Sequence, residues 1–288
     1  MTIQLGIIGF PIGHSLSPVF QQAALDHLKL DAIYSTWEID PGDLGSFIDG
    51  LRSPDIQGIN VTVPHKEAVV PLLDHVDEWA LQAGAVNTIV NRGGPLYGYN
   101  TDGIGFIKGL RHNAPFELQN KTVLIIGAGG SARGVVRALA NESVGNIIIA
   151  NRTLSRAQSL STLSIGLGVP AQAISLDWQE LSIAAVQSEL IVNCTSVGMA
   201  HTSEFGLSPL LLQQISPNSV VYDLVYNPIE TQLLKEAVRA GAAVISGIKM
   251  LVYQGAASFE LWFDRPAPVD VMLESADKAI QNMAESPD

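Results

Sequence analysis

The fold of this 288-residue chain is decided by the stretch Lys121–Leu139, KTVLIIGAGGSARGVVRAL. A short apolar run, rich in β-branched residues, leads into a glycine-rich turn, and an amphipathic run follows the turn. This order predicts a buried strand, a tight turn and a helix. A strand joined to a helix in this way is the opening unit of an α/β domain built on a parallel sheet.

The glycines of this turn have the spacing G-x-G-x-x-G/A, with Gly127, Gly129 and Ala132 at the three positions. Gly127 allows the tight turn, Gly129 lets the backbone approach a pyrophosphate, and Ala132 lets the helix pack close to the strand. The helix N-terminus would present free N–H groups to phosphate. A purely structural glycine turn is the simpler interpretation, but the strand before it and the helix after it favour a dinucleotide site.

The end of the next expected strand, 146–151, bears on which dinucleotide is bound. It reads Asn151, Arg152 and Thr153, with Arg156 shortly after. NAD-binding proteins usually carry an acidic residue here, which binds the ribose 2′-hydroxyl and would repel a 2′-phosphate. An arginine can instead pair with that phosphate bidentately. We therefore expect NADP, and a solvated surface arginine is the less favoured interpretation.

Strands and helices alternate along the rest of the chain. Strands are expected at 4–9, 32–39, 56–63, 85–91, 96–100, 121–126, 146–151, 189–196, 219–226 and 242–246. Helices are expected at 17–30, 41–52, 67–84 with a break at Pro71, 102–113, 131–142, 153–163, 228–240, 248–263 and 268–283. The alternation predicts an α/β fold with parallel sheets covered by helices on both faces. A polar segment with a proline, 112–121, precedes the second series, and we expect the domain crossing near it.

Composition limits the class of protein and its partners. Hydrophobic residues make up 47% of the chain and charged residues 15%, which is typical of a globular protein. The net charge of −12 argues against nucleic acid or an anionic membrane as the main partner. The single cysteine, Cys194, excludes an internal disulfide and any multi-cysteine metal site. No signal-peptide pattern opens the sequence and no apolar run approaches membrane-span length, so we expect a soluble cytoplasmic protein.

A small anion site is predicted near the start of the chain, in GFPIGHSLSPVF (9–20). Ser17 has the pattern of a helix N-cap and Pro18 that of the first helical residue. Simple capping would explain Ser17 alone, but not the pair of Ser15 and Ser17. Two hydroxyls at a helix N-terminus suit a carboxylate. His14 is either a base or a loop residue that holds the turn.

Polar side chains gather at the ends of the expected strands. NVTVPHK (60–66) supplies Asn60, Thr62 and Lys66, and two later segments supply Asn87 and Asp102. Ligands of an open parallel sheet bind outside the carboxyl ends of its strands. The amides and hydroxyls suit a polyhydroxylated ligand, and a lysine beside an aspartate is an acid/base pair. The alternative for that pair is an ordinary surface salt bridge.

A series of motifs, in order along nearly the whole chain, resembles the shikimate dehydrogenase family. The motifs are GxPIxHSxSPxxxQ, NVTVPHK, GAVNT, YNTDGxG, GAGGSARG, NRT, TSxGM, DLVYNP and SGxxMLVxQ. The resemblance implies a mixed, mostly parallel α/β substrate domain at 1–105 and an NADP-binding Rossmann domain at 106–247. C-terminal helices in 248–288 would return to the first domain. It also implies reversible NADPH-dependent reduction of 3-dehydroshikimate to shikimate in aromatic amino-acid biosynthesis.

The resemblance also implies roles for single residues. Lys66 would be the general acid/base, paired with Asp102. The substrate would be held at its carboxylate end by Ser15, Ser17 and Tyr226, and at its ring hydroxyls by Asn60, Thr62, Asn87, Asp102 and Gln254. The cofactor would contact Glu78, Gly127, Ala128, Gly129, Gly130, Ser131, Asn151, Arg152, Thr153, Arg156, Thr195, Val225, Gly247 and Met250. Gln254 could instead face solvent, and Thr195 with Ser196 could merely shape a loop.

Three alternatives to this assignment differ in what they require. A broader quinate/shikimate dehydrogenase stays open on the substrate side, because quinate differs by ring saturation and one hydroxyl, although Arg152 argues against a preference for NAD. A methylene-tetrahydrofolate dehydrogenase has motifs that do not fit NVTVPHK together with YNTDG. A non-catalytic binding or sensor protein would have to lose Lys66 or Asp102, and both are present. Monomer and homodimer are equally compatible with the sequence.

Overall fold

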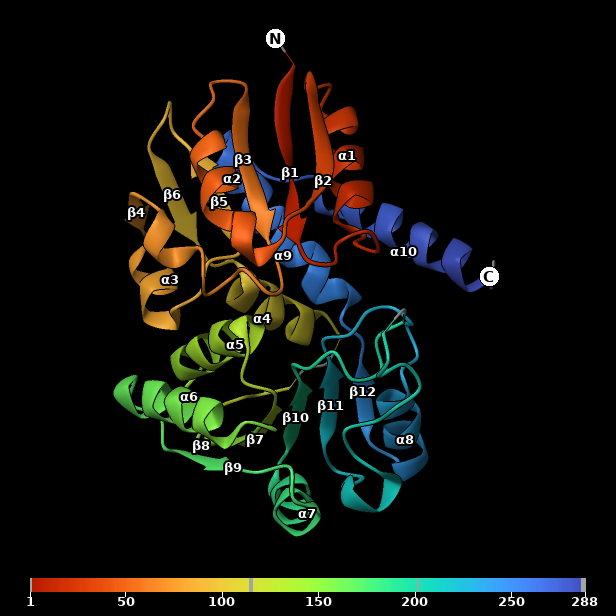
Figure 1. The fold of residues 1–288 in the computed structure, drawn as a ribbon. Helices are drawn as coiled ribbons and strands as arrows, with labels where there is room; N and C mark the ends of the chain where they lie inside the picture. Colours follow the sequence, from red (N-terminus) through yellow and green to blue (C-terminus); the bar gives the residue numbers. More distant parts are fainter. Residues whose placement is uncertain (1, 114–115, 201, 286–288) are drawn as a thin grey trace. The chain divides into compact units, whose positions relative to one another are not determined.

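The computed structural model describes residues 2–113, 116–200 and 202–285, and its chain forms two compact units. The first unit runs to Gly105 and resumes at Leu251, and the second is Phe106–Met250. Each unit contains one six-stranded sheet with helices packed on it (Figure 1). The α/β fold class expected from the sequence is confirmed.

The sheet of the first unit is mixed, with one strand reversed. Its strands are β1 (Ile3–Gly9), β2 (Ala32–Glu38), β3 (Ile56–Val61), β4 (His75–Val76), β5 (Thr88–Asn91) and β6 (Leu96–Tyr99), in the order β2-β1-β3-β5-β6-β4. β5 runs antiparallel to both β3 and β6, and the other pairs are parallel. The reversal places the first residue of β5, Thr88, opposite Asn60 on β3 and Tyr99 on β6. The beginning of β5 therefore lies at the edge where β3 and β6 end.

Helices of the first unit come from both ends of the chain. They are α1 (Ser17–His27), α2 (Leu44–Gly50), α3 (Glu78–Ala83), the start of α4 (Asp102–Asn113), most of α9 (Ile248–Phe263) and α10 (Val269–Glu285). α1 packs against α10. On α9, Trp262 donates from its indole N–H to the carbonyl of Ile89, 3.0 Å away. A Cβ at Gly58 would stand 2.5 Å from that indole nitrogen, so the glycine lets α9 approach the sheet.

The prediction of a long helix at 67–84, broken at Pro71, is mostly wrong. Pro71 lies in a single 3₁₀ turn, Val70–Leu72, which leads into the two-residue strand β4, and only α3 is helical. Asp77 starts α3 by accepting hydrogen bonds from the backbone N–H groups of Trp79 and Ala80. Gly84 ends it in the left-handed conformation, at φ 64°. A local capping signal and a proline thus divide a segment whose apolar pattern resembled one helix.

The sheet of the second unit is parallel throughout. Its strands are β7 (Thr122–Ile126), β8 (Asn146–Ala150), β9 (Ala171–Ile174), β10 (Leu190–Asn193), β11 (Val220–Asp223) and β12 (Ala243–Ile245). The order is β12-β11-β10-β7-β8-β9, which is the strand order of a dinucleotide-binding Rossmann fold. The order reverses between β7 and β10, where such a fold binds its ligand. β9 is a short, partly exposed edge strand, which is why its sequence gave no clear signal.

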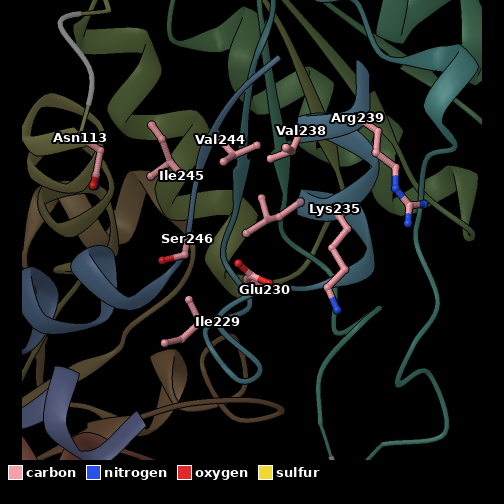
Figure 2. Close-up of a pocket in the computed structure, with 10 residues that line it drawn as sticks. Asn113, Ile229, Glu230, Lys235, Val238, Arg239, Val244, Ile245 and Ser246 are labelled. Atoms are coloured by element: carbon pink, nitrogen blue, oxygen red, sulfur yellow. The ribbon is translucent and has the colours of Figure 1, made fainter. Parts of the chain in front are cut away.

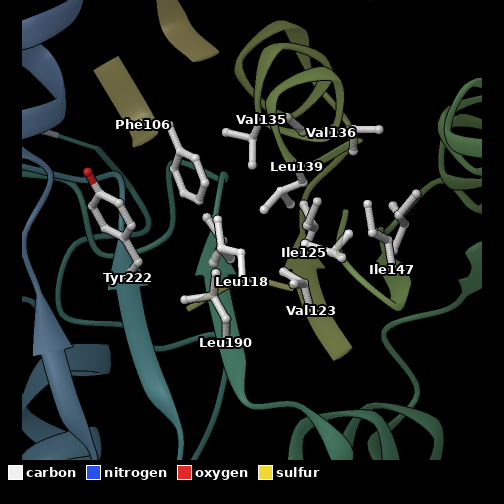
Figure 3. Close-up of a cluster of buried hydrophobic side chains, with 14 of the residues drawn as sticks. Phe106, Leu118, Val123, Ile125, Val135, Val136, Leu139, Ile147, Leu190 and Tyr222 are labelled. Carbon is white, nitrogen blue, oxygen red and sulfur yellow. The ribbon is translucent and has the colours of Figure 1, made fainter. Parts of the chain in front are cut away.

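Both faces of this sheet are covered. The helices are α5 (Gly130–Asn141), α6 (Leu154–Gly166), α7 (Trp178–Gln187) and α8 (Gln232–Ala240), of which α7 had not been expected. Val123 and Ile125 point into one core cluster with Leu139 of α5 (Figure 3). Leu124 belongs to the other cluster, with Leu233 of α8. Alternate residues of β7 are therefore buried on opposite faces of the sheet. Each fully buried Val, Leu or Ile side chain adds about 1.5–3 kcal/mol to stability.

Candidate active site

Lys66 and Asp102 form a buried ion pair in the first unit. Lys66 Nζ lies 2.6 Å from Asp102 Oδ2, and their side chains are only 9% and 4% exposed. Lys66 follows the end of β3, and its carbonyl accepts a hydrogen bond from Val86 N at 2.8 Å. Asp102 is the first residue of α4, and its N–H donates to Asn100 Oδ1 at 3.0 Å. Because both side chains are almost fully buried, the pair is not an ordinary surface salt bridge. Burying two charges is costly, so the pair needs further hydrogen-bond partners.

Asn87 connects this pair to the rest of the site. Its Nδ2 donates to Asp102 Oδ1 at 2.9 Å and to Gln254 Oε1 at 3.0 Å, and Thr101 Oγ1 lies 2.8 Å away. Its Oδ1 accepts from Thr101 N at 2.8 Å, which sets the orientation of the amide. Two N–H hydrogens thus face three acceptors. One acceptor is left over, and it can take a hydrogen bond from a ligand hydroxyl.

Gln254 and Asn60 belong to the same polar network. Gln254 is 9% exposed and contacts Asn87, so it does not simply face solvent. Asn60 Nδ2 donates to Ser258 Oγ at 2.9 Å, and Asn60 Oδ1 accepts from Tyr34 OH at 2.8 Å. Burial raises the pKa of Tyr34 well above its usual value, so this phenol stays a neutral donor.

Four residues of this network had not been identified from the sequence. They are Tyr34, Thr88, Thr101 and Ser258. Thr88 and Thr101 adjoin Asn87 and Asp102, and adjacency could have indicated them. Ser258 follows Gln254 by one turn of α9, a spacing that places both on one face. Tyr34 is on β2, and no local pattern distinguishes it from a core tyrosine.

The two serines near the start of α1 lie differently from the expected cap. The helix begins at Ser17 itself, its N-cap is Leu16, and no side chain caps it, so the assignment of Ser17 as N-cap is wrong. Ser15 Oγ accepts from Ser17 N at 3.2 Å. The hydroxyl of Ser17 is buried and has no hydrogen bond of good geometry among the described residues, although it lies close enough to the Tyr34 phenol to interact with it. Such an oxygen is costly unless a ligand or water completes it, which fits a place at the site.

Thr62 follows the last residue of β3 and lies at the same end of the sheet as Asn60. Its N–H donates to the carbonyl of Ile8 at 2.9 Å, and its carbonyl accepts from His65 N at 2.9 Å. His65 is buried, and its Nε2 lies 2.8 Å from the carbonyl of Ile39. These contacts fix the turn that carries Lys66.

The second unit has the features that a pyrophosphate requires. Gly127 has φ 106°, and a Cβ there would stand 3.0 Å from Thr195 Cγ2. Gly129 is the N-cap of α5, and a Cβ on it would meet no atom of the described residues within 4 Å. Ala132 is fully buried behind the turn. The glycine loop therefore leaves an open approach to the N–H groups at the start of α5.

The end of β8 is positively charged. Arg152 and Arg156 are exposed there, and the first turn of α6 contains no acidic residue. Thr153 is the N-cap of α6, and Asn151 Nδ2 donates to its carbonyl at 2.9 Å. A phosphate at this corner would meet two guanidinium groups and no carboxylate of that helix turn, so the residues present fit NADP.

The other predicted cofactor residues fall into two groups. In the second unit, Val225 N donates to Asp223 Oδ1 at 3.0 Å, and Gly247 N donates to the carbonyl of Val225 at 3.4 Å. Met250 is buried in a core cluster of that unit. In the first unit, exposed Glu78 accepts from Gln82 Nε2 at 3.1 Å. The roles of these residues toward the cofactor, and that of partly buried Tyr226 toward the substrate, stay predictions.

A cavity of about 490 Å³ lies elsewhere in the second unit. Its lining comes from α8, β12, the segment before α8 and the end of α4 (Figure 2). The lining residues are Asn113, Ile229, Glu230, Leu234, Lys235, Val238, Arg239, Val244, Ile245 and Ser246. None of them is a predicted site residue.

The described residues contain neither a candidate metal centre nor a helix that could span a membrane. They contain no group of three or more histidine, cysteine, aspartate or glutamate side chains placed to hold a metal ion. Within the same part of the chain, no helix is long and apolar enough to span a bilayer.

Three family models match the chain in succession. Residues 7–89 match the shikimate dehydrogenase substrate binding domain, and residues 110–207 match shikimate / quinate 5-dehydrogenase. Residues 247–276 match the shikimate 5′-dehydrogenase C-terminal domain.

Relatives and solved structures agree with these models. The NADP(+) shikimate dehydrogenase of Geobacillus kaustophilus is 42% identical over 96% of this chain and 98% of its own. The Thermus thermophilus shikimate 5-dehydrogenase, solved with NADP(H) and shikimate, has a TM-score of 0.85 and 34% identity, over 96% of this chain and 99% of that one. A Corynebacterium glutamicum quinate dehydrogenase in complex with NAD also has a TM-score of 0.85, with 30% identity over 96% and 99% of the two chains.

Proposed function

Because the chain belongs to the shikimate dehydrogenase family, we propose that it catalyses the reversible NADPH-dependent reduction of 3-dehydroshikimate to shikimate. This reaction is a step of the shikimate pathway toward chorismate and the aromatic amino acids. The observation that carries the proposal is the buried pair of Lys66 and Asp102, with Asn87 and Gln254 bonded beside it.

The proton transfer follows from the geometry of this pair. When bound, NADPH supplies the hydride that reduces the ketone carbon. Lys66 Nζ carries three hydrogens, of which one points to Asp102 Oδ2, and another can protonate the oxygen that becomes the new hydroxyl. Asp102 holds the ammonium group in place. In the reverse direction Lys66, once neutral, accepts the hydroxyl proton.

The remaining polar groups of the first unit suit the rest of the substrate. Ser15 and the buried hydroxyl of Ser17 would donate to the carboxylate. Asn60, Thr62 and the one surplus acceptor around Asn87 would bind the ring hydroxyls. A site with paired donors and acceptors discriminates strongly against ligands that leave them unsatisfied.

Cofactor binding belongs to the second unit in this proposal. The glycine loop and the N-terminus of α5 would hold the pyrophosphate, with Ala128, Gly130 and Ser131 completing the turn. Arg152 and Arg156 would pair with the 2′-phosphate.

The first test is the absorbance of NADPH formed by the purified protein with shikimate or quinate and with NADP or NAD. We expect fast reduction only with NADP and shikimate. Comparable rates with quinate or NAD would assign the protein to the broader quinate/shikimate branch. The curated relatives of 40–45% identity are NADP(+) shikimate dehydrogenases, which favours the narrower activity. No reduction with any pair, despite measurable shikimate binding, would indicate a non-catalytic binding protein.

We also propose a cytoplasmic location and a monomeric or homodimeric state. A chain with one cysteine needs no oxidising compartment, and the reaction uses a soluble cofactor and a small-molecule substrate. Light scattering of the purified protein distinguishes the two oligomeric states.

A further inference from the structure

Asp223, the last residue of β11, is a buried carboxylate that the proposed reaction does not use. The residue is fully buried, and both of its oxygens accept hydrogen bonds. Oδ1 accepts from Asn193 Nδ2 at 2.9 Å and from Val225 N at 3.0 Å. Oδ2 accepts from Thr231 Oγ1 at 2.6 Å. A charge at such a position is costly, so its donors must all be in place.

The three donors belong to three different segments at the carboxyl edge of the sheet. Asn193 ends β10, Val225 lies in the loop after β11, and Thr231 is the N-cap of α8. Thr231 Oγ1 also accepts from Leu234 N at 3.3 Å, so its hydroxyl both caps the helix and donates to Asp223. The carboxylate thus joins two loops and a helix start that are not adjacent in sequence.

A continuous line of contacts leads from Asp223 to the glycine turn. Asn193 uses its Nδ2 for Asp223 and its Oδ1 for Thr195, accepting from Thr195 N at 3.0 Å and Thr195 Oγ1 at 2.6 Å. The methyl group of Thr195 lies against Gly127, where an added Cβ would stand 3.0 Å away. The loop that touches the glycine turn is therefore held by the amide that Asp223 orients.

We infer that Asp223 is a positioning residue for the dinucleotide site, acting through Asn193 and Thr195 on the glycine turn and directly on the backbone of Val225. The inference rests on the proposed NADPH-dependent function and adds a residue to it. Burial raises the pKa of Asp223 to about 6, while its hydrogen bonds lower it, so the carboxylate is ionised at neutral pH. An ionised carboxylate is acceptor-only, as its donors require.

The matched variants are Asp223→Asn, Thr231→Val and Thr231→Ser. Asp223→Asn keeps the shape of the side chain but replaces one acceptor oxygen with an N–H₂ donor, which would face groups that themselves donate. Thr231→Val removes one donor and keeps the charge, whereas Thr231→Ser keeps the hydroxyl. NADPH affinity is measured by the fluorescence of the bound nucleotide, and shikimate affinity by calorimetry.

We expect Asp223→Asn to weaken NADPH binding roughly 10- to 100-fold, the range for a hydrogen bond to a charged group. The KM for NADPH should rise in parallel, with the shikimate Kd unchanged. Thr231→Val should also weaken NADPH binding. Thr231→Ser, which keeps the hydroxyl, should bind NADPH with the wild-type Kd.

Variants that melt earlier but bind NADPH with the wild-type Kd would overturn the inference and leave Asp223 a structural residue. If Asp223→Asn does not fold, the comparison of Thr231→Val with Thr231→Ser decides the question. A wild-type protein that fails to bind NADPH would instead refute the proposed function, so the two failures are distinguishable.

Discussion

The buried pair of Lys66 and Asp102 has separable effects on stability and on chemistry. Lys66→Met leaves the carboxylate of Asp102 buried without its cation, which should lower the free energy of unfolding by about 3 kcal/mol. Loss of the general acid/base should also lower kcat by roughly 10²- to 10⁴-fold. Steady-state kinetics and denaturant unfolding of the same preparation measure both.

The double variant Lys66→Met/Asp102→Asn is the control, because it removes both buried charges. We expect it to regain most of the lost stability while kcat stays low. A kcat that recovers together with stability would mean that Lys66 acts through folding alone.

Gln254 provides a second test at the residue scale. Gln254→Ala removes one acceptor beside Asn87, so the KM for shikimate should rise about 2- to 10-fold, the effect of one neutral hydrogen bond. We expect kcat to change much less. Ser258→Ala, one turn further along α9, serves as the comparison, since the Ser258 hydroxyl contacts Asn60 and the backbone carbonyl of Gln254 but not the side chain of Asn87. An unchanged KM in Gln254→Ala would remove this residue from the substrate site.

Asp223 should make stability depend on pH in an unusual direction. Its pKa is raised from 3.8 to about 6 in the folded protein, so the folded state binds a proton more tightly than the unfolded state. The stability contribution of this residue therefore falls as pH rises from about 4 to about 6, by up to about 3 kcal/mol.

The comparison that isolates this effect is wild type against Asp223→Asn, unfolded by urea at pH 4, 5, 6 and 7. The free energy of unfolding of the variant relative to wild type should increase across that range. A constant difference would show that Asp223 has the same pKa in both states.

At the scale of secondary-structure elements, the connection between β8 and α6 should decide the choice of cofactor. Replacing Arg152 and Arg156 with serine removes one guanidinium group just before the N-cap of α6 and one from its first turn. The KM for NADPH should rise about 10- to 100-fold, because hydrogen bonds between charged groups contribute about 1.5–3 kcal/mol. The KM for NADH should change little. An equal rise for both cofactors would show that the arginines do not recognise the 2′-phosphate.

Elements also show where sequence patterns were sufficient. The strand β7, the glycine turn and α5 lie where Lys121–Leu139 predicted them, because spacing of glycines and apolar residues acts within one short segment. The segment 67–84 was misjudged since apolar residues there cover a turn, a two-residue strand and a short helix. Helix α8 begins at Gln232 rather than Pro228, because Thr231 supplies the cap.

At the scale of the whole molecule, the two units should bind different ligands. Each has its own hydrophobic core and its own sheet. We therefore expect shikimate alone to slow hydrogen exchange at the end of β3 and the start of α4. NADPH alone should slow it at the glycine turn and at the start of α6. Mass spectrometry of exchanged peptides measures both, and protection of the glycine turn by shikimate alone would contradict this division.

Local sequence determined the fold class, the glycine turn, the arginines after β8 and the identity of Lys66 and Asp102 as a candidate pair. Those features depend on residue type and short spacing, which the chain states directly. Only the tertiary structure decided that β5 runs backwards, and this brings Asn87 and Thr88 to the end of β3. It also decided that Tyr34 and Ser258 complete the network and that Asp223 joins three segments. Such contacts link residues far apart in sequence, and strand direction and order, which no local pattern encodes, determine which of them meet.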